Sequence, residues 1–549
     1  MSDTPILTGE TLNGETFVRE WRENAARLQE AHAYDPAHEH ESCGVGFVAA
    51  IDGKPRREVV TSAIQALKAV WHRGAVDADG KTGDGAGIHI EIPADFFREE
   101  VANTGHKLLD ERIGVGMVFL PRTDLAAQER CRIIVESEIL KTGCFIYGWR
   151  QVPVDISVIG EKANATRPEI EQIMFSVPPE HDAEQVERDL YIIRRRIEKA
   201  ALSEHITDFY ICSMSCRSII YKGMFLGEQL TVFYPDLLDE RFVSNFVVYH
   251  QRYSTNTFPT WSLAQPFRML AHNGEINTVR GNSNWMKSHE TLMVSEVFGP
   301  AGEDIKPLIP QGSSDSGALD AVFEALCHAG RSAPLVKLML VPPAWSKVPD
   351  VPEAHRSLYA YLNTVMEPWD GPAALAVYDG RWIAAGMDRN GLRPMRYAIT
   401  ADGLLVVGSE AGMVPLTDQD VIEKGRVGPG EILGVDLQEG KLYHDRALKD
   451  LLAAEHDYAS WAGKTTRLGA LIDQVPAPQP RFNADELRRR QLAVGLTIED
   501  LELILHPMVE EGKEAVGSMG DDAPIAVLSS HYRGLHNFFR QEFSQVTNP

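Results

Sequence analysis

The sequence predicts an α/β protein in which sheets and helices stack in layers. From Cys43 onward, short apolar strands alternate with longer helices. Ile88, Ile90 and Ile92 alternate with polar residues, as in a half-buried strand, and Pro93 ends the run. No internal repeat is visible along the chain. We therefore expect mixed sheets covered by helices rather than a helical bundle.

The elements follow from the spacing of apolar residues. A first strand carries its apolar face at 45, 47 and 49, and a helix follows with its apolar face at 60, 63, 64, 67 and 71. Further strands are expected at 113–119, 208–213, 217–221, 246–250, 373–378 and 381–386. Further helices are expected at 124–141, 183–203, 317–328 and 354–366.

Both ends of the chain depart from this pattern. Residues 1–42 are expected to form a leader with one amphipathic helix, on which Phe17, Trp21, Ala25 and Leu28 recur at helical spacing. The proline-rich run 475–480 (VPAPQP) is typical of a linker. Beyond it, a helix and an apolar strand at Ile525–Leu528 begin another unit, which we expect to be truncated. The predicted organisation is a leader at 1–42, a main domain at 43–470, and a linker with the start of a second domain at 471–549.

Composition narrows the class of protein. A chain of 549 residues is too long for one compact core, so two or more domains are expected. The net charge of −24 argues against nucleic acid or an anionic membrane surface as the main partner. Six unevenly spaced cysteines do not form a disulfide framework. The sequence lacks a signal peptide and an apolar run of about 18 residues. We therefore predict a cytoplasmic protein.

Cys43 is the most informative residue. It ends a polar stretch and opens an apolar, glycine-containing strand. If the bond after Ser42 were cut, the new α-amine would lie beside the thiol, so that one residue would supply both nucleophile and base. An arbitrary cysteine is more often a small buried core residue.

Three other signals are rejected. The run at 44–49 matches G-x-G-x-x-A, but it lies within a strand and follows a polar loop, whereas a dinucleotide fingerprint opens a helix. Gly80-Lys81-Thr82 lacks the earlier glycine of a P-loop, because position 75 is Ala75. The remaining cysteines are too scattered to supply the ligands of a zinc or iron–sulfur site.

Two arginines follow predicted elements. Arg73, in His72-Arg73-Gly74, ends the first helix, where Gly74 would cap the helix and the basic residues would complement its dipole. Arg73 could in addition hold a substrate carboxylate or brace a loop. Arg252 lies just past a strand end among small polar residues, which suits bidentate capture of a carboxylate. A lone arginine is more often part of a surface ion pair.

Two further runs carry polar groups at turns. Asn273 and Gly274 lie between a strand and a helix, where a side-chain amide and a glycine N–H can converge as an oxyanion hole. Asn-Gly is also a common turn. Asp315 lies in a run that precedes a helix, where it could cap that helix or bind a substrate ammonium group.

Taken together, these runs resemble the class II glutamine amidotransferases, and in particular the N-terminal glutaminase domain of glutamate synthases. The runs are CGVGFVA, HRGAVDADGKTGDGAG, YHQRYSTNTFPTWSLAQPFRMLAHNGEINT, QGSSDSGALD, MEPWDGPAAL and DRNGLRP. The later run GSMGDDAPIAVLS resembles the start of the central domain of glutamate synthases. The resemblance covers nearly everything from Tyr34 to Pro549.

The resemblance implies the αββα sandwich of the N-terminal nucleophile (Ntn) hydrolases and removal of a prosegment to expose Cys43. It implies that Asn273 and Gly274 form the oxyanion hole for glutamine. It also implies that Arg252 holds the α-carboxylate, that Asp315 holds the α-ammonium group, and that Arg73 supports the same pocket.

For a longer protein, the resemblance implies that ammonia reaches 2-oxoglutarate and that the product is reduced at FMN. An iron–sulfur cluster would take part, with electrons from an NADPH-oxidising flavoprotein subunit or ferredoxin. These cofactors are expected outside residues 1–549, and none is expected within them.

Two alternatives remain open at this stage. The chain could be the glutaminase half of an amidophosphoribosyltransferase or a glucosamine-phosphate synthase, although the GSMGDDAPIAVLS run speaks against both. It could also be a non-catalytic scaffold that docks partner subunits. If the chain is a glutamine amidotransferase, a form that retains residues 1–42 is expected to be a zymogen with little activity, because Cys43 then has no free amine.

Overall fold

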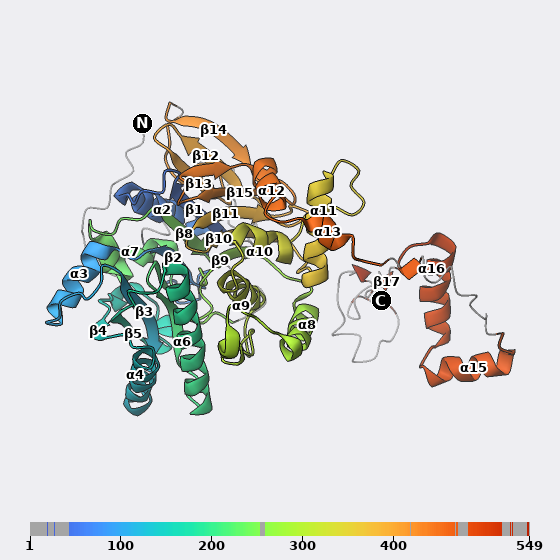
Figure 1. Cartoon of the computed structure of the whole chain (residues 1–549), viewed down its shortest axis with the longest axis horizontal. Coiled ribbons are helices and arrows are strands. Elements are labelled where there is room, and N and C mark those ends of the chain that lie inside the picture. Colours follow the sequence, from blue (N-terminus) through green and yellow to red (C-terminus); the bar gives the residue numbers. More distant parts are fainter. Residues whose placement is uncertain are drawn as a thin grey trace. The chain divides into compact units, whose positions relative to one another are not determined.

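The computed structural model describes residues 43–252, 258–417, 419–466, 468–469 and 481–515, with isolated positions near both ends. The chain divides into two compact units, Met1–Lys464 and Thr465–Pro549 (Figure 1). The predicted leader positions 17, 21, 25 and 28, the linker at 475–480 and the strand positions 525–527 lie outside the described residues.

Two large sheets dominate the described part of the first unit. One has seven strands in the order β14 (Val421–Arg426), β12 (Arg396–Thr400), β13 (Leu404–Gly408), β1 (Gly44–Ala50), β8 (Phe246–Gln251), β2 (Ala86–Glu91) and β7 (Ser218–Gly223). The other has five, in the order β16 (Lys441–Tyr443), β15 (Ile432–Asp436), β11 (Trp382–Met387), β10 (Ala373–Tyr378) and β9 (Leu270–Gly274). Neighbouring strands in both sheets are antiparallel, so the expected mixed sheets are not observed.

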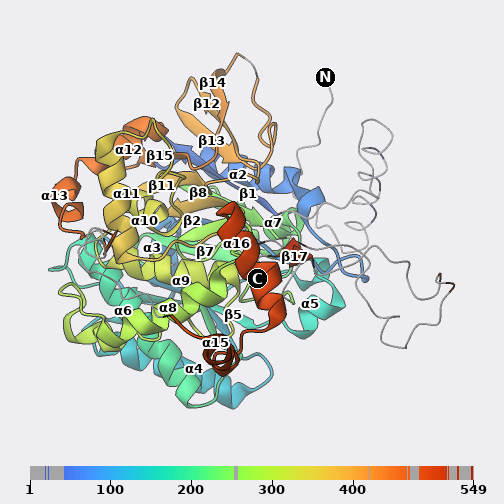
Figure 2. The same ribbon diagram turned by 90° about the vertical axis from the view of Figure 1, so that its right-hand side faces the viewer.

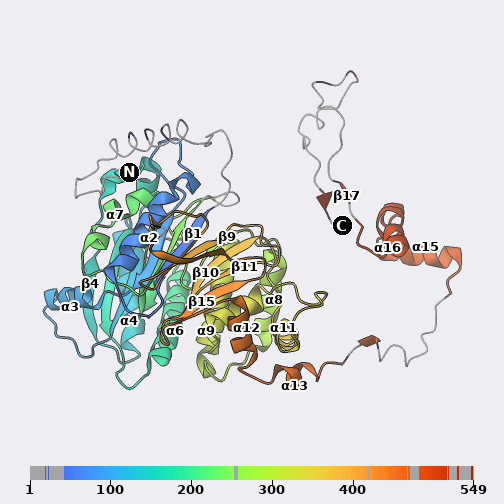
Figure 3. The same ribbon diagram turned by 90° about the horizontal axis from the view of Figure 1, so that it is seen from above.

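The two sheets face each other across a dry apolar layer. Alternate residues of β1, β8, β10 and β15 form this layer, among them Phe47, Val248, Ala376 and Val435. Helices cover the two outer faces: α2 (Arg57–Ala69) covers the seven-stranded sheet, and α9 (Asp315–His328), α10 (Ala333–Leu340), α11 (Glu353–Val365) and α12 (Asp445–Ala453) cover the five-stranded sheet. The layers can be followed from above in Figure 3. The predicted αββα sandwich is therefore confirmed.

A third sheet of four strands packs beside the sandwich. Its order is β4 (Ile146–Gln151), β5 (Glu169–Ser176), β3 (Ile113–Leu120) and β6 (Tyr210–Ser215). One face joins the core that lies under α2, and the other is covered by α4 (Leu125–Leu140) and α6 (Ala183–Ser203). On the other side of the sandwich, the paired strands β12 and β14 extend beyond the body of the unit (Figure 2).

Further elements of the first unit lie outside these layers or at their edges. They are η1 (Trp71–Arg73), α3 (Ala94–Asn103), α5 (Glu161–Ala165), α7 (Leu230–Phe233), α8 (Val279–Leu292) and α13 (Tyr458–Ala462). In the second unit, the structure describes α15 (Ala484–Ala493), a π-helical turn (Asp500–Leu505), α16 (His506–Glu511) and the strand pair β17 (Gly517–Ser518) and β18 (Val546–Thr547). The side chain of Asn483 caps α15 by accepting a hydrogen bond from the Glu486 N–H at 2.9 Å. Among the described helices, none has the length and apolar character needed to cross a membrane.

The predicted strands and helices of the main domain are present, with shifted ends. The strand expected at 208–213 is Tyr210–Ser215, and the helix expected at 317–328 begins at Asp315. One local prediction was wrong. Helix α2 ends at Ala69, and Gly74 follows η1 with an extended backbone at φ −91°, so it is not a left-handed helix cap. A Cβ at Gly74 would lie 2.4 Å from Gln251 Nε2 and 2.8 Å from Leu226 Cδ2, so these two side chains would have to shift.

Candidate functional site

Cys43 lies at the start of β1, the strand between β13 and β8, and its side chain is partly buried. The backbone just after it is tightly enclosed. A Cβ at Gly44 would lie 2.6 Å from Val70 Cγ2, and one at Gly46 would lie 2.1 Å from the Val407 carbonyl oxygen. The backbone of β13 therefore approaches β1 closely at Gly46.

Asn273 is carried by β9, which lies against β1 from the facing sheet. Its side chain is 1% exposed, and its Nδ2 donates to the carbonyl oxygen of Cys43 at 2.8 Å. The amide is therefore fixed within hydrogen-bond reach of the candidate nucleophile's own backbone. A buried, oriented amide donor is one half of an oxyanion hole.

Gly274 ends β9 with φ +152°, a value that favours glycine. A Cβ there would lie 1.8 Å from the carbonyl oxygen of Pro372. The Glu275 N–H donates to that same oxygen at 2.9 Å. In an antiparallel pair, hydrogen-bonded and non-hydrogen-bonded residues alternate, so the N–H of Gly274 points away from β10.

The N–H groups at alternate positions of β9 share this outward direction, because β9 is the edge strand of its sheet. The Leu270 N–H donates to Asp320 Oδ1 at 3.1 Å, and the His272 N–H donates to Gln265 Oε1 at 2.8 Å. The Gly274 N–H comes next in the series, beside the amide of Asn273. A side-chain amide, that of Asn273, and a backbone N–H, that of Gly274, thus lie at the same end of β9.

Arg252 follows β8 directly, and its backbone N–H donates to the Gly85 carbonyl oxygen at 2.8 Å. Only 6% of the residue is exposed. Burial lowers the pKa of its guanidinium, and the nearby acidic groups of Cys43, Asp84 and Asp315 oppose that shift. The guanidinium therefore lies within electrostatic reach of Cys43 and Asp315. The rest of its run, 253–257, lies outside the described residues.

Asp315 is the first residue of α9, after the N-cap Ser314. Its Oδ2 accepts from the Ile276 N–H at 2.9 Å, and its Oδ1 accepts from the Ser316 N–H at 2.7 Å. The first of these bonds ties the carboxylate to the segment that follows Gly274. Cys43, Arg252, Asn273, Gly274 and Asp315, which are far apart in the sequence, therefore gather around one end of the sandwich.

Arg73 takes a different position from the other predicted residues. Its Nε donates to Glu410 Oε1, which also lies 2.8 Å from His72 Nε2. Burial would raise the pKa of Glu410, but the hydrogen bonds from His72 and Arg73 hold it at about 2. Glu410 follows Ser409, whose N–H donates to the Val45 carbonyl oxygen at 2.9 Å. Arg73 thus braces the turn that lies beside the start of β1.

Sequence reasoning missed several residues that shape this region. Gln265 and His272 hold the outer edge of β9, Asp388 accepts from the Ala373 N–H opposite Gly274 at 3.0 Å, and Glu410 anchors Arg73. His272 lies in the run around Asn273, and Asp388 begins the run DRNGLRP, so both were within the runs that carried the resemblance. Glu410 lies in none of those runs.

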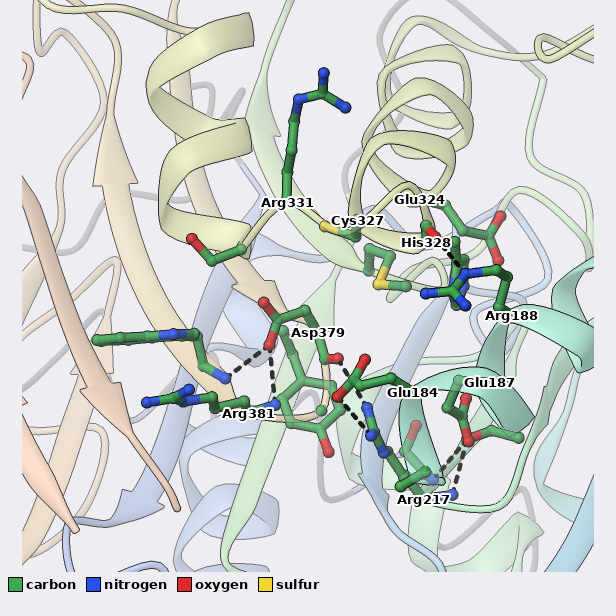
Figure 4. A pocket seen from close by; sticks show the side chains of 18 of the residues that line it. Glu184, Glu187, Arg188, Arg217, Glu324, Cys327, His328, Arg331, Asp379 and Arg381 are labelled. Atoms are coloured by element: carbon green, nitrogen blue, oxygen red, sulfur yellow. Dashed lines mark hydrogen bonds and ion pairs between the residues drawn. The ribbon is translucent and has the colours of Figure 1, made fainter. Parts of the chain in front are cut away.

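A hollow in the described part lies elsewhere. It measures about 690 Å³ and is lined by residues such as His89, Tyr378 and Asp379, which lie at the ends of β2 and β10 away from Cys43. Its charges largely pair with one another: Arg217 donates to Glu184 at 2.7 Å (Figure 4). Within the described residues, no group of three or more His, Cys, Asp or Glu side chains could hold a metal ion.

Comparison with known proteins gives a consistent result. Residues 43–461 match the family model described as glutamine amidotransferases class-II, and residues 489–549 match the glutamate synthase central domain. The chain is 65% identical to the glutamate synthase (NADPH) large chain of Azospirillum brasilense, over 99% of this chain and 36% of that protein. It is 44% identical to ferredoxin-dependent glutamate synthase 2 of Synechocystis, over 93% of this chain and 33% of that protein.

The chain thus spans about a third of the length of these relatives. Among solved structures, the glutamine phosphoribosylpyrophosphate amidotransferase of B. subtilis matches at 19% identity with a TM-score of 0.25, over 41% of this chain and 40% of that one. That likeness is too weak to carry an argument. The family match covers most of the first unit and includes every residue gathered around Cys43. The chain belongs to the class II glutamine amidotransferases.

Proposed function

We propose that residues 43–461 hydrolyse the side-chain amide of L-glutamine to glutamate and ammonia through a thioester on Cys43. The observation that supports this most directly is the 2.8 Å hydrogen bond from Asn273 Nδ2 to the Cys43 carbonyl oxygen. It sets an amide donor beside the candidate nucleophile. The Gly274 N–H, which points off the edge of the same strand, supplies a second donor.

The reaction begins with removal of residues 1–42, so that the α-amine of Cys43 becomes free. The amine takes the thiol proton, and the thiolate adds to the amide carbon of glutamine. The negative charge that develops on the amide oxygen is stabilised by Asn273 and the Gly274 N–H. The carbon–nitrogen bond then breaks, and nitrogen leaves as ammonia with the proton from the amine. Water next adds to the thioester and releases glutamate and the thiol.

The amino-acid end of glutamine carries two opposite charges. Arg252 binds the α-carboxylate, because a buried guanidinium presents two parallel donors to a carboxylate. Asp315 binds the α-ammonium group. The two groups are already within electrostatic reach of each other, which suits a ligand that is itself a zwitterion. Arg73 supports the site through Glu410 rather than by touching glutamine.

For the longer protein, we propose that the ammonia reacts with 2-oxoglutarate and that the resulting imine is reduced to glutamate. An FMN and an iron–sulfur cluster, which lie outside residues 1–549, would supply that reduction. The relative with the higher identity is an NADPH enzyme, which favours an NADPH-oxidising flavoprotein subunit over ferredoxin as the electron donor. We place this chemistry in the cytoplasm.

The test combines the intact mass of the purified chain with ammonia release from glutamine. We expect a mass that starts at Cys43, glutamine-dependent ammonia, and covalent labelling of Cys43 by a glutamine-shaped electrophile. Cys43→Ala should abolish release and labelling. Cys216→Ala is the matched control, because Cys216 is also partly buried, but burial raises the pKa of its thiol and makes it a poor nucleophile.

Two outcomes would reject the proposal. A chain shown by mass to retain residues 1–42 that hydrolyses glutamine at the full rate would exclude the free amine as the base. A processed chain that neither releases ammonia nor reacts at Cys43 would favour a non-catalytic docking scaffold.

A further inference from the structure

His272 is buried in β9, directly before Asn273, and only 1% of it is exposed. Its ring Nδ1 lies 2.7 Å from the hydroxyl of Ser316, in the first turn of α9. Ser316 follows Asp315 and donates its backbone N–H to that carboxylate. The imidazole thus spans the gap between the strand that carries the oxyanion donors and the helix that carries the carboxylate.

The backbone of His272 is held on both sides. Its N–H donates to Gln265 Oε1 at 2.8 Å, and its carbonyl oxygen lies 3.1 Å from His250 Nε2 and 3.4 Å from Gln265 Nε2. The peptide planes on both sides of His272 therefore have little freedom to rotate. Because the Gly274 N–H lies two residues further along the same strand and points in the same direction, its aim depends on these planes.

The charge state of the ring fits a structural link. Burial lowers the pKa of His272, and the nearby carboxylate of Asp315 only partly opposes that shift. A neutral imidazole offers one donor and one acceptor, and a hydroxyl can pair with either. The ring can therefore hold Ser316 without a net charge, and the Ser316 hydroxyl in turn lies 3.3 Å from Asp315 Oδ1.

We propose that His272 is a positioning residue, which sets the distance between the oxyanion donors and Asp315 through its bond to Ser316. The distance matters because a short, rotatable chain joins the amide of glutamine to its α-ammonium group, so that the site selects one separation between them. A site held at that separation orients the amide carbon toward Cys43. This inference rests on the proposed glutaminase function and adds to it a residue that does not touch the substrate.

The test is a double-mutant cycle on the processed chain, with His272→Ala, Ser316→Ala and both together. Residues that orient a functional group without touching the substrate typically change activity by about 10- to 100-fold when they are replaced. We expect each single variant to lower kcat/KM for glutamine by about that factor. The double variant should lose little more than the worse single variant, because both changes break one link. His272→Asn, whose amide can take the place of Nδ1, should recover part of the loss.

Two further measurements separate positioning from general damage. Alkylation of Cys43 by iodoacetamide requires neither Arg252 and Asp315 nor the oxyanion donors. Its rate in the variants should therefore stay within about twofold of the wild-type rate. His89→Ala is the matched control. His89 is also a buried histidine whose ring nitrogen lies 2.7 Å from a serine hydroxyl, that of Ser218, but this pair lies by the remote hollow. His89→Ala should lower thermal stability and leave kcat/KM unchanged.

Several results would overturn the inference. They are additive losses in the cycle, wild-type kcat/KM in His272→Ala, or an equal loss in His89→Ala. If His272→Ala does not fold, Ser316→Ala and His272→Asn still decide, because wild-type kcat/KM in Ser316→Ala also rejects the link. If the wild-type chain itself releases no ammonia and does not react with the glutamine-shaped electrophile, the proposed function and this inference both fail. An active wild type with unaffected variants rejects only the inference.

Discussion

At the scale of single residues, Gly274 carries the sharpest steric constraint in the site. Its φ of +152° and the Pro372 carbonyl oxygen, 1.8 Å from where a Cβ would lie, exclude any side chain. Gly274→Ala should push β9 away from β10 and misdirect the N–H. We expect kcat for ammonia release to fall by about 100-fold or more, the loss typical of removing one oxyanion donor.

Gly281→Ala is the control for this change. Gly281 lies within α8, and a Cβ there would meet nothing within 4 Å. Alanine is the better helix former by about 1 kcal/mol, so this variant should unfold at a slightly higher temperature with unchanged kcat. Equal kcat values in the two variants would show that the Gly274 N–H takes no part in the reaction.

The ion pair between Arg73 and Glu410 should make the stability of the fold depend on pH. Burial would raise the pKa of Glu410, but hydrogen bonds from His72 and Arg73 hold it at about 2, below its ordinary value of 4.5. Because the folded-state pKa is the lower one, the carboxylate stabilises the fold fully above pH 4.5. This contribution is lost as the pH falls toward about 2.

Glu410→Gln should therefore have a lower Tm than wild type at neutral pH, and the difference should shrink once the pH falls below about 4.5. Thermal unfolding followed by circular dichroism across this range measures it. A Tm difference that stays constant down to about pH 3 would show that the charge of Glu410 contributes nothing.

Sequence patterns identified the residues around Cys43 because each lies in a run of chemically informative neighbours. Arg73 shows the limit of this reasoning. The run His72-Arg73-Gly74 was interpreted as a helix end whose arginine could hold a substrate carboxylate or brace a loop. Its partner Glu410 could not be predicted, because it is 337 positions away and lies outside the recognised runs. Gly74 was misassigned for a similar reason: its constraint comes from the side chain of Gln251, which local turn chemistry does not reveal.

At the scale of elements, α6 and α9 are joined by a buried ion pair. Arg194 and Glu324 are 2% and 5% exposed, and their side chains approach to 2.6 Å. Arg194→Met would leave Glu324 buried without this partner, which typically costs about 3–5 kcal/mol. The double variant Arg194→Met/Glu324→Met should recover most of that loss, because no unpaired charge is then buried. Denaturant unfolding measures both, and equal stability of the single and double variants would contradict the expectation.

Elements with a clear apolar stripe were predicted well, as α6 and β3 show. Several elements without one were missed. Helix α10 is buried along its whole length, Lys337 included, so it has no polar face to reveal its period. Strand β4 contains Gly148, where the register shifts, and this breaks its alternation. Strand β14 alternates only between half-buried and exposed residues, which gives too weak a signal.

At the scale of the whole molecule, the four apolar clusters of the described residues lie between Val45 and Tyr458. The first unit therefore contains its own cores. A chain that ends at Lys464 should unfold cooperatively, with the same Tm as the first unit has within the longer chain. It should release ammonia at the same rate as the longer chain. Calorimetry and the ammonia assay test this. Loss of a cooperative transition would show that residues 465–549 complete the core.

The layered architecture could be predicted from the sequence, but the pairing of strands could not. Alternating strands and helices suggested mixed sheets, whereas β1 pairs with β13, more than half a chain away, and with β8, more than a third of a chain away. Such partners are chosen by the shape of the shared apolar layer, which no local pattern records. The gathering of Arg252, Asn273 and Asp315 depends on that pairing.

The edge strand β9 has a consequence for the behaviour of the protein in concentrated solution. An exposed strand edge is a template on which other chains can add strands and aggregate. Here the outward N–H groups of Leu270 and His272 are occupied by side chains, those of Asp320 and Gln265. The sheet therefore ends at β9. The next outward N–H, that of Gly274, can bind a small molecule, while the occupied edge does not allow a strand of another chain to pair with β9.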